Sequence, residues 1–186
     1  EPDVQNKRIW LSCRTQDADG SWRDNLRFAG PLAYSGEVPD LYSAAVSESG
    51  MLVVAVLSGT NSISVFVSKD QARTFTRRNL PQQKDSLVAP SIFCMPDGTF
   101  RLFTSLSKRS AAANASAQTY SFYLYASESS DALNWKDFSE FKPAAQCKNP
   151  FAPTVCAAPS GIFMIFQAQH QQDKRLSYQL YICHSV

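Results

Sequence analysis

The sequence predicts an all-β fold built from repeated antiparallel sheets. Runs of β-branched and aromatic residues, such as residues 64–67 and 121–125, are typical of strands. Turn-forming residues separate such runs, as in Pro-Asp-Gly at 96–98 and Pro-Ser-Gly at 159–161. No stretch keeps the 3.6-residue apolar period that an amphipathic helix requires. These observations favour strands throughout the chain.

Internal repetition predicts the order of the strands. Three segments, which begin near Asp40, Ala89 and Ala152, share one outline: a short strand, a glycine turn, an apolar strand, a polar loop and a further strand. The apolar runs at 51–57 and 162–166 suit strands that are buried on both faces, as in stacked sheets. The chain is therefore expected to be a row of similar units.

A turn motif recurs after the third strand of each unit. Its copies start at residues 15, 68, 129 and 185, at spacings of 53, 61 and 56 residues, and the last copy is truncated. An aspartate in such a turn can accept hydrogen bonds from backbone N–H groups two or three residues on. A following Trp or Phe would pack between neighbouring sheets. The motif residues are Thr15, Asp17 and Trp22; Ser68, Asp70, Thr74 and Phe75; and Ser129, Asp131 and Trp135.

These turns resemble the BNR/Asp-box repeat, Ser/Thr-x-Asp-x-Gly-x-Thr-Trp/Phe, of sialidase-like β-propellers. Ala72 stands where that motif has glycine, and the copy at 129 is one residue shorter. The resemblance covers nearly the whole chain. It implies one all-β domain over 1–186, a β-propeller segment of about three four-stranded antiparallel blades in an incomplete ring. The expected blade units are approximately 1–38 (partial), 39–88, 89–150 and 151–186 (partial).

The resemblance also implies which face carries function. In that family the turn motif is structural and lies on the side away from the active site, so the motif residues named above are expected to be structural. The expected functional face comprises loops 28–39, 81–89 and 141–153 between blades and loops 58–62, 107–119 and 169–176 within blades. Ligand candidates near or in these loops are Tyr34, Asp40, Lys84, Asp85, Lys148, Asn149, Asp173 and Arg175.

Composition excludes several other classes. The 18 Lys and Arg residues nearly balance the 16 Asp and Glu residues, which argues against a nucleic-acid-binding stripe. No apolar run approaches the roughly 20 residues of a membrane span. Five cysteines without a CxxC pair, beside two histidines, do not form a zinc pattern, and no metal or cofactor is expected. A disulfide between Cys147 and Cys156 and free thiols at both positions are left open. The family favours a secreted, cell-surface or periplasmic location.

Two functions fit this face. The first is non-catalytic recognition of a glycan or a protein. The alternative is a portion of an exo-sialidase or related glycoside hydrolase whose catalytic residues lie mostly outside this chain. The Phe/Tyr-Arg-Ile-Pro signature of sialidases is not met, because Arg8-Ile9 is followed by Trp10, and no carboxylate pair stands out. Another chain or a further segment is expected to complete the propeller, since a partial ring would expose sheet edges.

Overall fold

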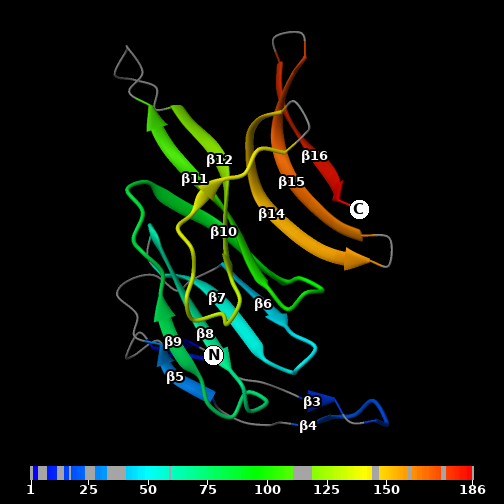
Figure 1. Cartoon of the computed structure of the whole chain (residues 1–186). Coiled ribbons are helices and arrows are strands. Elements are labelled where there is room, and N and C mark those ends of the chain that lie inside the picture. The colour runs from blue at the N-terminus through cyan, green and yellow to red at the C-terminus, as the bar shows by residue number, and fades with distance from the viewer. Residues whose placement is uncertain are drawn as a thin grey trace.

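The computed structural model describes residues 2–3, 8–11, 15–16, 18–23, 28–32, 41–58, 60–110, 119–143, 147–158, 161–172 and 175–185. These residues form strands and their connections, and none of them is helical. Figure 1 shows three larger sheets arranged side by side, with the C-terminal strand at one edge of the row. This is the all-β architecture that the sequence predicts.

The two larger four-stranded sheets are antiparallel meanders in sequence order. The first sheet contains β6 (Tyr42–Val46), β7 (Leu52–Ser58), β8 (Ser62–Ser68) and β9 (Thr76–Asn79). The second sheet contains β10 (Ser86–Cys94), β11 (Phe100–Ser110), β12 (Thr119–Ser129) and β13 (Ser139–Glu140).

The remaining strands lie before and after these two sheets in the sequence. The third sheet contains β14 (Lys148–Ala158), β15 (Gly161–Gln172) and β16 (Arg175–Ser185). Near the N-terminus, β1 (Pro2–Asp3), β2 (Arg8–Leu11) and β5 (Phe28–Leu32) form a small sheet in the order β1-β2-β5. The hairpin of β3 (Thr15–Gln16) and β4 (Trp22–Arg23) is inserted between β2 and β5.

Several strands extend further than the sequence predicts. Residues 28–32, 86–89 and 148–153 were expected in loops and belong to β5, β10 and β14. The hairpin strands β11 and β12 also stay paired as far as Ser110 and Thr119, inside the predicted loop 107–119. Ladder hydrogen bonds join backbone groups, so pairing continues through polar side chains that read as loop in the sequence.

The turn between β8 and β9 is held by Ser68 and Asp70. Asp70 Oδ1 accepts hydrogen bonds from the backbone N–H groups of Arg73 (3.1 Å) and Thr74 (2.9 Å), and Oδ2 accepts from Thr74 Oγ1 (2.6 Å). Ser68 Oγ donates to Asp70 Oδ1 (2.8 Å) and accepts from the N–H of Ala72 (2.9 Å). Ala72, in the place of the expected glycine, adopts a left-handed φ of 63°.

The turn between β12 and β13 repeats this chemistry one residue shorter. Asp131 Oδ1 accepts from the N–H groups of Leu133 (2.9 Å) and Asn134 (2.7 Å), and Asn134 Nδ2 donates to Oδ2 (2.7 Å). Asn134 thus supplies the side-chain hydrogen bond to the aspartate that Thr74 supplies in the other turn. Trp135 Nε1 donates to the carbonyl of Ala132 (2.8 Å) while its ring packs against the core.

The first copy of the motif is a different turn in its described part. Thr15 and Trp22 lie in the paired strands β3 and β4, and Asp17 lies outside the described residues. Asp19 is the acceptor here, for Ser21 N (2.9 Å) and Ser21 Oγ (2.7 Å).

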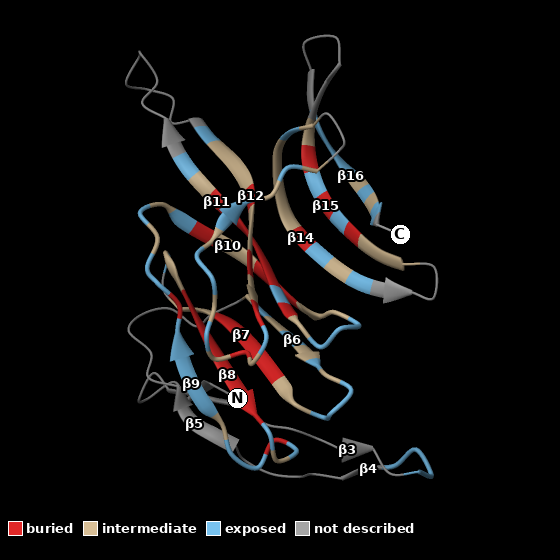
Figure 2. Ribbon diagram, in the orientation of Figure 1, coloured by how far each residue is buried: buried red, intermediate tan, exposed pale blue. Residues whose placement is uncertain are grey.

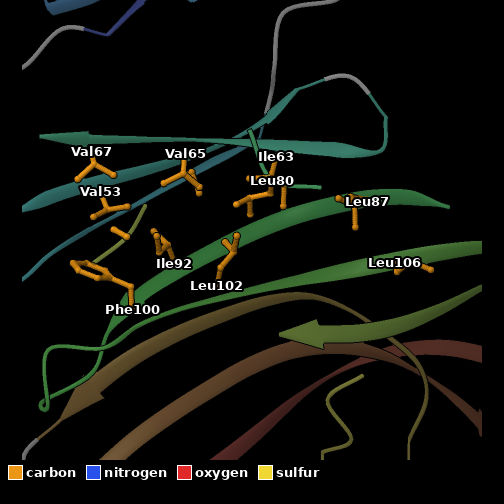
Figure 3. Packing of buried hydrophobic residues seen from close by; sticks show 12 residues of the cluster. Val53, Ile63, Val65, Val67, Leu80, Leu87, Ile92, Phe100, Leu102 and Leu106 are labelled. Carbon is orange, nitrogen blue, oxygen red and sulfur yellow. The ribbon is translucent and has the colours of Figure 1, made fainter. Parts of the chain in front are cut away.

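Apolar side chains fill the spaces between successive sheets. The largest cluster joins the first and second sheets, and Figure 3 shows Val53, Val65 and Ile63 facing Ile92 and Leu102 across that interface. A second cluster, built around Phe103, Leu124, Met164 and Phe166, joins the second and third sheets. Figure 2 shows the buried residues concentrated on the central strands. Each fully buried large side chain contributes about 1.5–3 kcal/mol.

The same hydrogen bond ties each sheet to the next. Ser43 Oγ accepts from the N–H of Ile92 (3.0 Å), and Ser91 Oγ accepts from the N–H of Val155 (3.3 Å). Ser43 pairs with Ala55 and Ser91 with Phe103, so the two serines hold the same register position on the first strand of their sheets. The sheets therefore follow one another by a repeated geometry.

Candidate functional site

The hairpin between β7 and β8 lies against the link between the first and second sheets. The N–H of Leu87 donates to the carbonyl of Thr60 (2.7 Å), and Asn61 exchanges three hydrogen bonds with Gln82 and Gln83. The β7–β8 hairpin is therefore fastened to the segment that leads into β10. The ligand candidates Lys84 and Asp85 lie in this segment, with Lys84 exposed and Asp85 half-buried.

The first strands of the three sheets enclose a groove of about 320 Å³. Each strand contributes three consecutive residues: Leu41, Tyr42 and Ser43; Ala89, Pro90 and Ser91; and Ala152, Pro153 and Thr154. The groove, which we call the axial groove, follows the line along which the sheets meet. Tyr42 is 73% exposed, so its ring is available to a ligand.

Two β-bulges shape the axial groove. The register of β10 shifts between Val88 and Ser91, and that of β14 shifts between Phe151 and Thr154. Ala89 and Ala152 adopt left-handed φ values of 50° and 53° at these bulges. Both precede a proline, which has no N–H for the ladder. The repeated Ala-Pro pair at 89–90 and 152–153 was visible in the sequence, but it was used only to define the repeat.

A wider hollow of about 590 Å³ lies between the second and third sheets. Its lining includes residues of β12, such as Phe122 and Tyr123, together with Lys142 and Lys148. Lys148 and Asn149, both ligand candidates, line this hollow and not the axial groove.

Asn149 is fully engaged in holding strands together. It has a left-handed φ of 51°, its Oδ1 accepts from the N–H of Phe122 (3.3 Å), and its Nδ2 donates to Gln169 Oε1 (2.6 Å). Gln169 Nε2 in turn donates to the hydroxyl of Tyr178 (3.2 Å). This chain of bonds connects β12, β14, β15 and β16, so Asn149 positions the rim of the hollow.

Four ligand candidates cannot be placed in either cavity. Tyr34, Asp40 and Asp173 lie outside the described residues, and of Arg175 only the backbone, in β16, is described. The structure thus brings Lys148 and Asn149 together and puts Lys84 and Asp85 in a separate link. Tyr42, Pro90 and Pro153 line the axial groove instead.

The carboxylates whose pKa values are lowered by hydrogen bonds lie outside both the axial groove and the wider hollow. Hydrogen bonds, chiefly that from the Thr74 hydroxyl, lower the pKa of Asp70 to about 2. Backbone N–H donors, first that of Asn134, hold the pKa of Asp131 well below its usual range. A hydrogen bond from Lys136 lowers the pKa of Glu128, which Arg101 also approaches at 3.4 Å. None of the described residues that line the axial groove is acidic.

The described part of the chain offers no group of three His, Cys, Asp or Glu side chains that could hold a metal ion. Cys94, Cys147, Cys156 and Cys183 are free thiols, so Cys147 and Cys156 do not form the disulfide that the sequence left open. Within the same residues, no helix has the length and apolar character needed to cross a membrane.

Solved structures of carbohydrate-processing enzymes share this fold. The chain matches the alpha-L-arabinanase of Cellvibrio cellulosa with a TM-score of 0.57 at 12% identity, over 96% of this chain and 65% of that one. It matches the Penicillium chrysogenum alpha-L-arabinanase complexed with arabinobiose with a TM-score of 0.62 at 16% identity, over 100% of this chain and 56% of that one. The GH93 alpha-L-arabinofuranosidase of Fusarium graminearum gives 0.61 at 14% identity, over 98% and 55%.

The chain is a β-propeller segment. Its sheets correspond to blades of an incomplete ring, and it spans between about half and two thirds of the length of these structures. No family model matches the sequence, and no curated protein matches it. None of the three structures named above is a sialidase, so the sialidase-like interpretation of the turns is not confirmed.

Proposed function

We propose that this chain is the carbohydrate-binding portion of a glycoside-hydrolase-type propeller and that it holds the sugar in the axial groove. The observation that carries the proposal is the composition of that groove, whose lining includes the exposed ring of Tyr42 and the exposed hydroxyl-bearing side chain of Thr154. Aromatic rings pack against the apolar faces of sugar rings, while hydroxyls form hydrogen bonds with the sugar hydroxyls at the ring edges.

Arabinobiose is the first ligand to test. Two of the structures that share the fold are complexes with arabinobiose. Their sequence identities to this chain are only 14–16%, so arabinobiose is a ligand that we propose for this chain. Titration of residues 1–186 with arabinobiose, followed by NMR chemical shifts or calorimetry, should show saturable binding. A sialoside, run in parallel, tests the sugar class that the turn motif implied.

Tyr42→Ala tests the place of binding. Loss of the ring should weaken arabinobiose binding by about two- to tenfold, since a stacked aromatic contact contributes on the order of 0.5–1.5 kcal/mol beyond its area. Tyr178→Ala is the matched control, because Tyr178 is also exposed and lies outside the groove. Equal affinities for both variants, or saturable binding of neither sugar to the unaltered chain, would contradict the proposal.

The chain's contribution to hydrolysis is proposed to come through Asp40. Glycoside hydrolysis uses a pair of carboxylates, and the groove residues named above include none. Asp40 directly precedes the groove residue Leu41 in the sequence. In the native polypeptide that contains this sequence, Asp40→Asn should abolish arabinan hydrolysis while leaving arabinobiose binding intact. Asp137→Asn, an exposed acid outside the groove, should leave both unchanged.

A further inference from the structure

The wider hollow between the second and third sheets has a positively charged rim. Its described lining carries two basic side chains, Lys142 and Lys148, and one acidic side chain, Glu140, and all three are exposed. Neither lysine has an ion-pair partner among the described residues, whereas Lys136 outside the hollow is paired with Glu128. The two ammonium groups of the rim are therefore available to an anion from solvent.

The link that leads into the third sheet differs at this place from the link that leads into the second. Counting back from the repeated Ala-Pro pairs, Lys148 corresponds to Asp85 and Pro150 to Leu87. Leu87 is 1% exposed and belongs to the core between the first and second sheets, whereas Pro150 lines the hollow. The first link is also fastened to its hairpin by the three hydrogen bonds of Asn61 described above. The second link thus places a cation where the first has an acid, and a cavity wall where the first has core.

The backbone that carries Lys148 is held in place by its neighbours. Asn149, the next residue, has both ends of its amide engaged, by the N–H of Phe122 and by Gln169. The ring of Phe151 contacts that of Phe122, with 5.3 Å between the centroids. A site that is formed in advance loses less conformational entropy when a ligand binds.

The less exposed part of the lining is apolar. Leu124 is 1% exposed, and Phe141 is half-buried, with its ring centroid 5.7 Å from that of Phe103. The volume of about 590 Å³ lies within the range of about 300–1,000 Å³ that is typical of small-molecule sites. Apolar surface beside a cationic rim suits a ligand that has both an apolar face and an anionic group.

We propose that the hollow is a second saccharide site and that it binds a uronic acid, a sugar whose exocyclic carbon is a carboxylate. Lys142 and Lys148 donate charge-assisted hydrogen bonds to the carboxylate. The apolar face of the sugar ring lies against Leu124 and Phe141. Glu140 repels the carboxylate and so favours its placement beside the lysines. The choice of a sugar rests on the proposed carbohydrate function, but the site shares no residue with the axial groove.

Titration of residues 1–186 with digalacturonate, followed by NMR chemical shifts, tests the proposal. We expect saturable binding, with the largest shifts in residues 121–124 and 148–149 and none in the groove residues 41–43. Binding should weaken as salt is raised, because added ions screen the attraction between the lysines and the carboxylates. Acetate at the same concentration should not compete, because it lacks the sugar ring.

Charge substitutions on the rim should change the affinity in opposite directions. Lys142→Gln and Lys148→Gln should each weaken digalacturonate binding by about two- to fivefold, as expected for an exposed ion pair. Glu140→Gln should strengthen it, because a like charge is removed. Lys69→Gln is the matched control, since Lys69 is also exposed but lies in the turn between β8 and β9. All four positions are exposed, so the fold is expected to tolerate each change.

Several outcomes would overturn the uronic acid site. They are the absence of saturable digalacturonate binding, an equal loss of affinity in Lys69→Gln, and full displacement by acetate or arabinobiose. Tyr42→Ala should leave digalacturonate affinity unchanged, and a loss there would move the ligand to the axial groove and also refute the site. If digalacturonate binds as expected while arabinobiose does not bind, the arabinobiose proposal alone fails, so the two proposals are tested separately.

Discussion

Asp70 and Asp131 hold turns of different length with the same set of bonds. In each, one carboxylate oxygen accepts two backbone N–H groups and the other accepts a side-chain donor, from Thr74 or from Asn134. Both carboxylates are therefore committed to their own turns. An aspartate that is conspicuous in the sequence is here a poor choice for a catalytic acid.

The pKa of Asp70 gives a testable pH dependence. Its pKa is lowered from 3.8 to about 2 in the folded protein, first by the Thr74 hydroxyl. The stabilisation that it provides is present above the unfolded pKa, near pH 4, and is lost as the pH falls toward about 2. Tm of the unaltered protein should therefore fall more steeply between pH 5 and 2 than that of Asp70→Asn. The exposed Asp137→Asn serves as control and should keep the original slope; equal slopes for Asp70→Asn would refute the assignment.

At the scale of elements, a hydrogen bond from a backbone N–H to a serine hydroxyl joins the first strands of successive sheets. Ser91 is 7% exposed, and its hydroxyl accepts the N–H of Val155. Ser91→Ala leaves that N–H without its acceptor and should lower the free energy of unfolding by about 1–2 kcal/mol. Urea denaturation measures this effect. Ser139→Ala, at an exposed position on the short strand β13, should change it by less than about 0.5 kcal/mol.

Strands and repeats were predictable, whereas the groove was not. The β-branched and aromatic runs at 64–67 and 121–125 became β8 and β12 because local composition and burial agree there. The axial groove depends on Ala89 and Ala152, which adopt left-handed φ values before proline, where local preference favours extended backbone. Only packing between sheets fixes such bulges, and local sequence does not show them. The sequence therefore indicated polar loop residues, such as Lys84, as ligand candidates.

At the scale of the whole molecule, stability is unevenly distributed. Among the described residues, the cluster between the first and second sheets contains twelve buried residues, against five between the second and third, so the first interface should open less readily. Hydrogen exchange should find the amides of β7, β8 and β11 more protected than those of β16. Similar protection in β8 and β16 would contradict this gradient.

The repeated tie from Ser43 to Ile92 and from Ser91 to Val155 also bears on how such a molecule evolves. The second sheet carries both an acceptor for its successor, Ser91, and a donor to its predecessor, the N–H of Ile92, so a duplicated unit of this kind would bring both halves of the tie with it. Contacts between nearest neighbours alone hold such arrays together. Duplication or deletion of a unit can therefore change the length of such an array while keeping the hydrogen bond between neighbouring units.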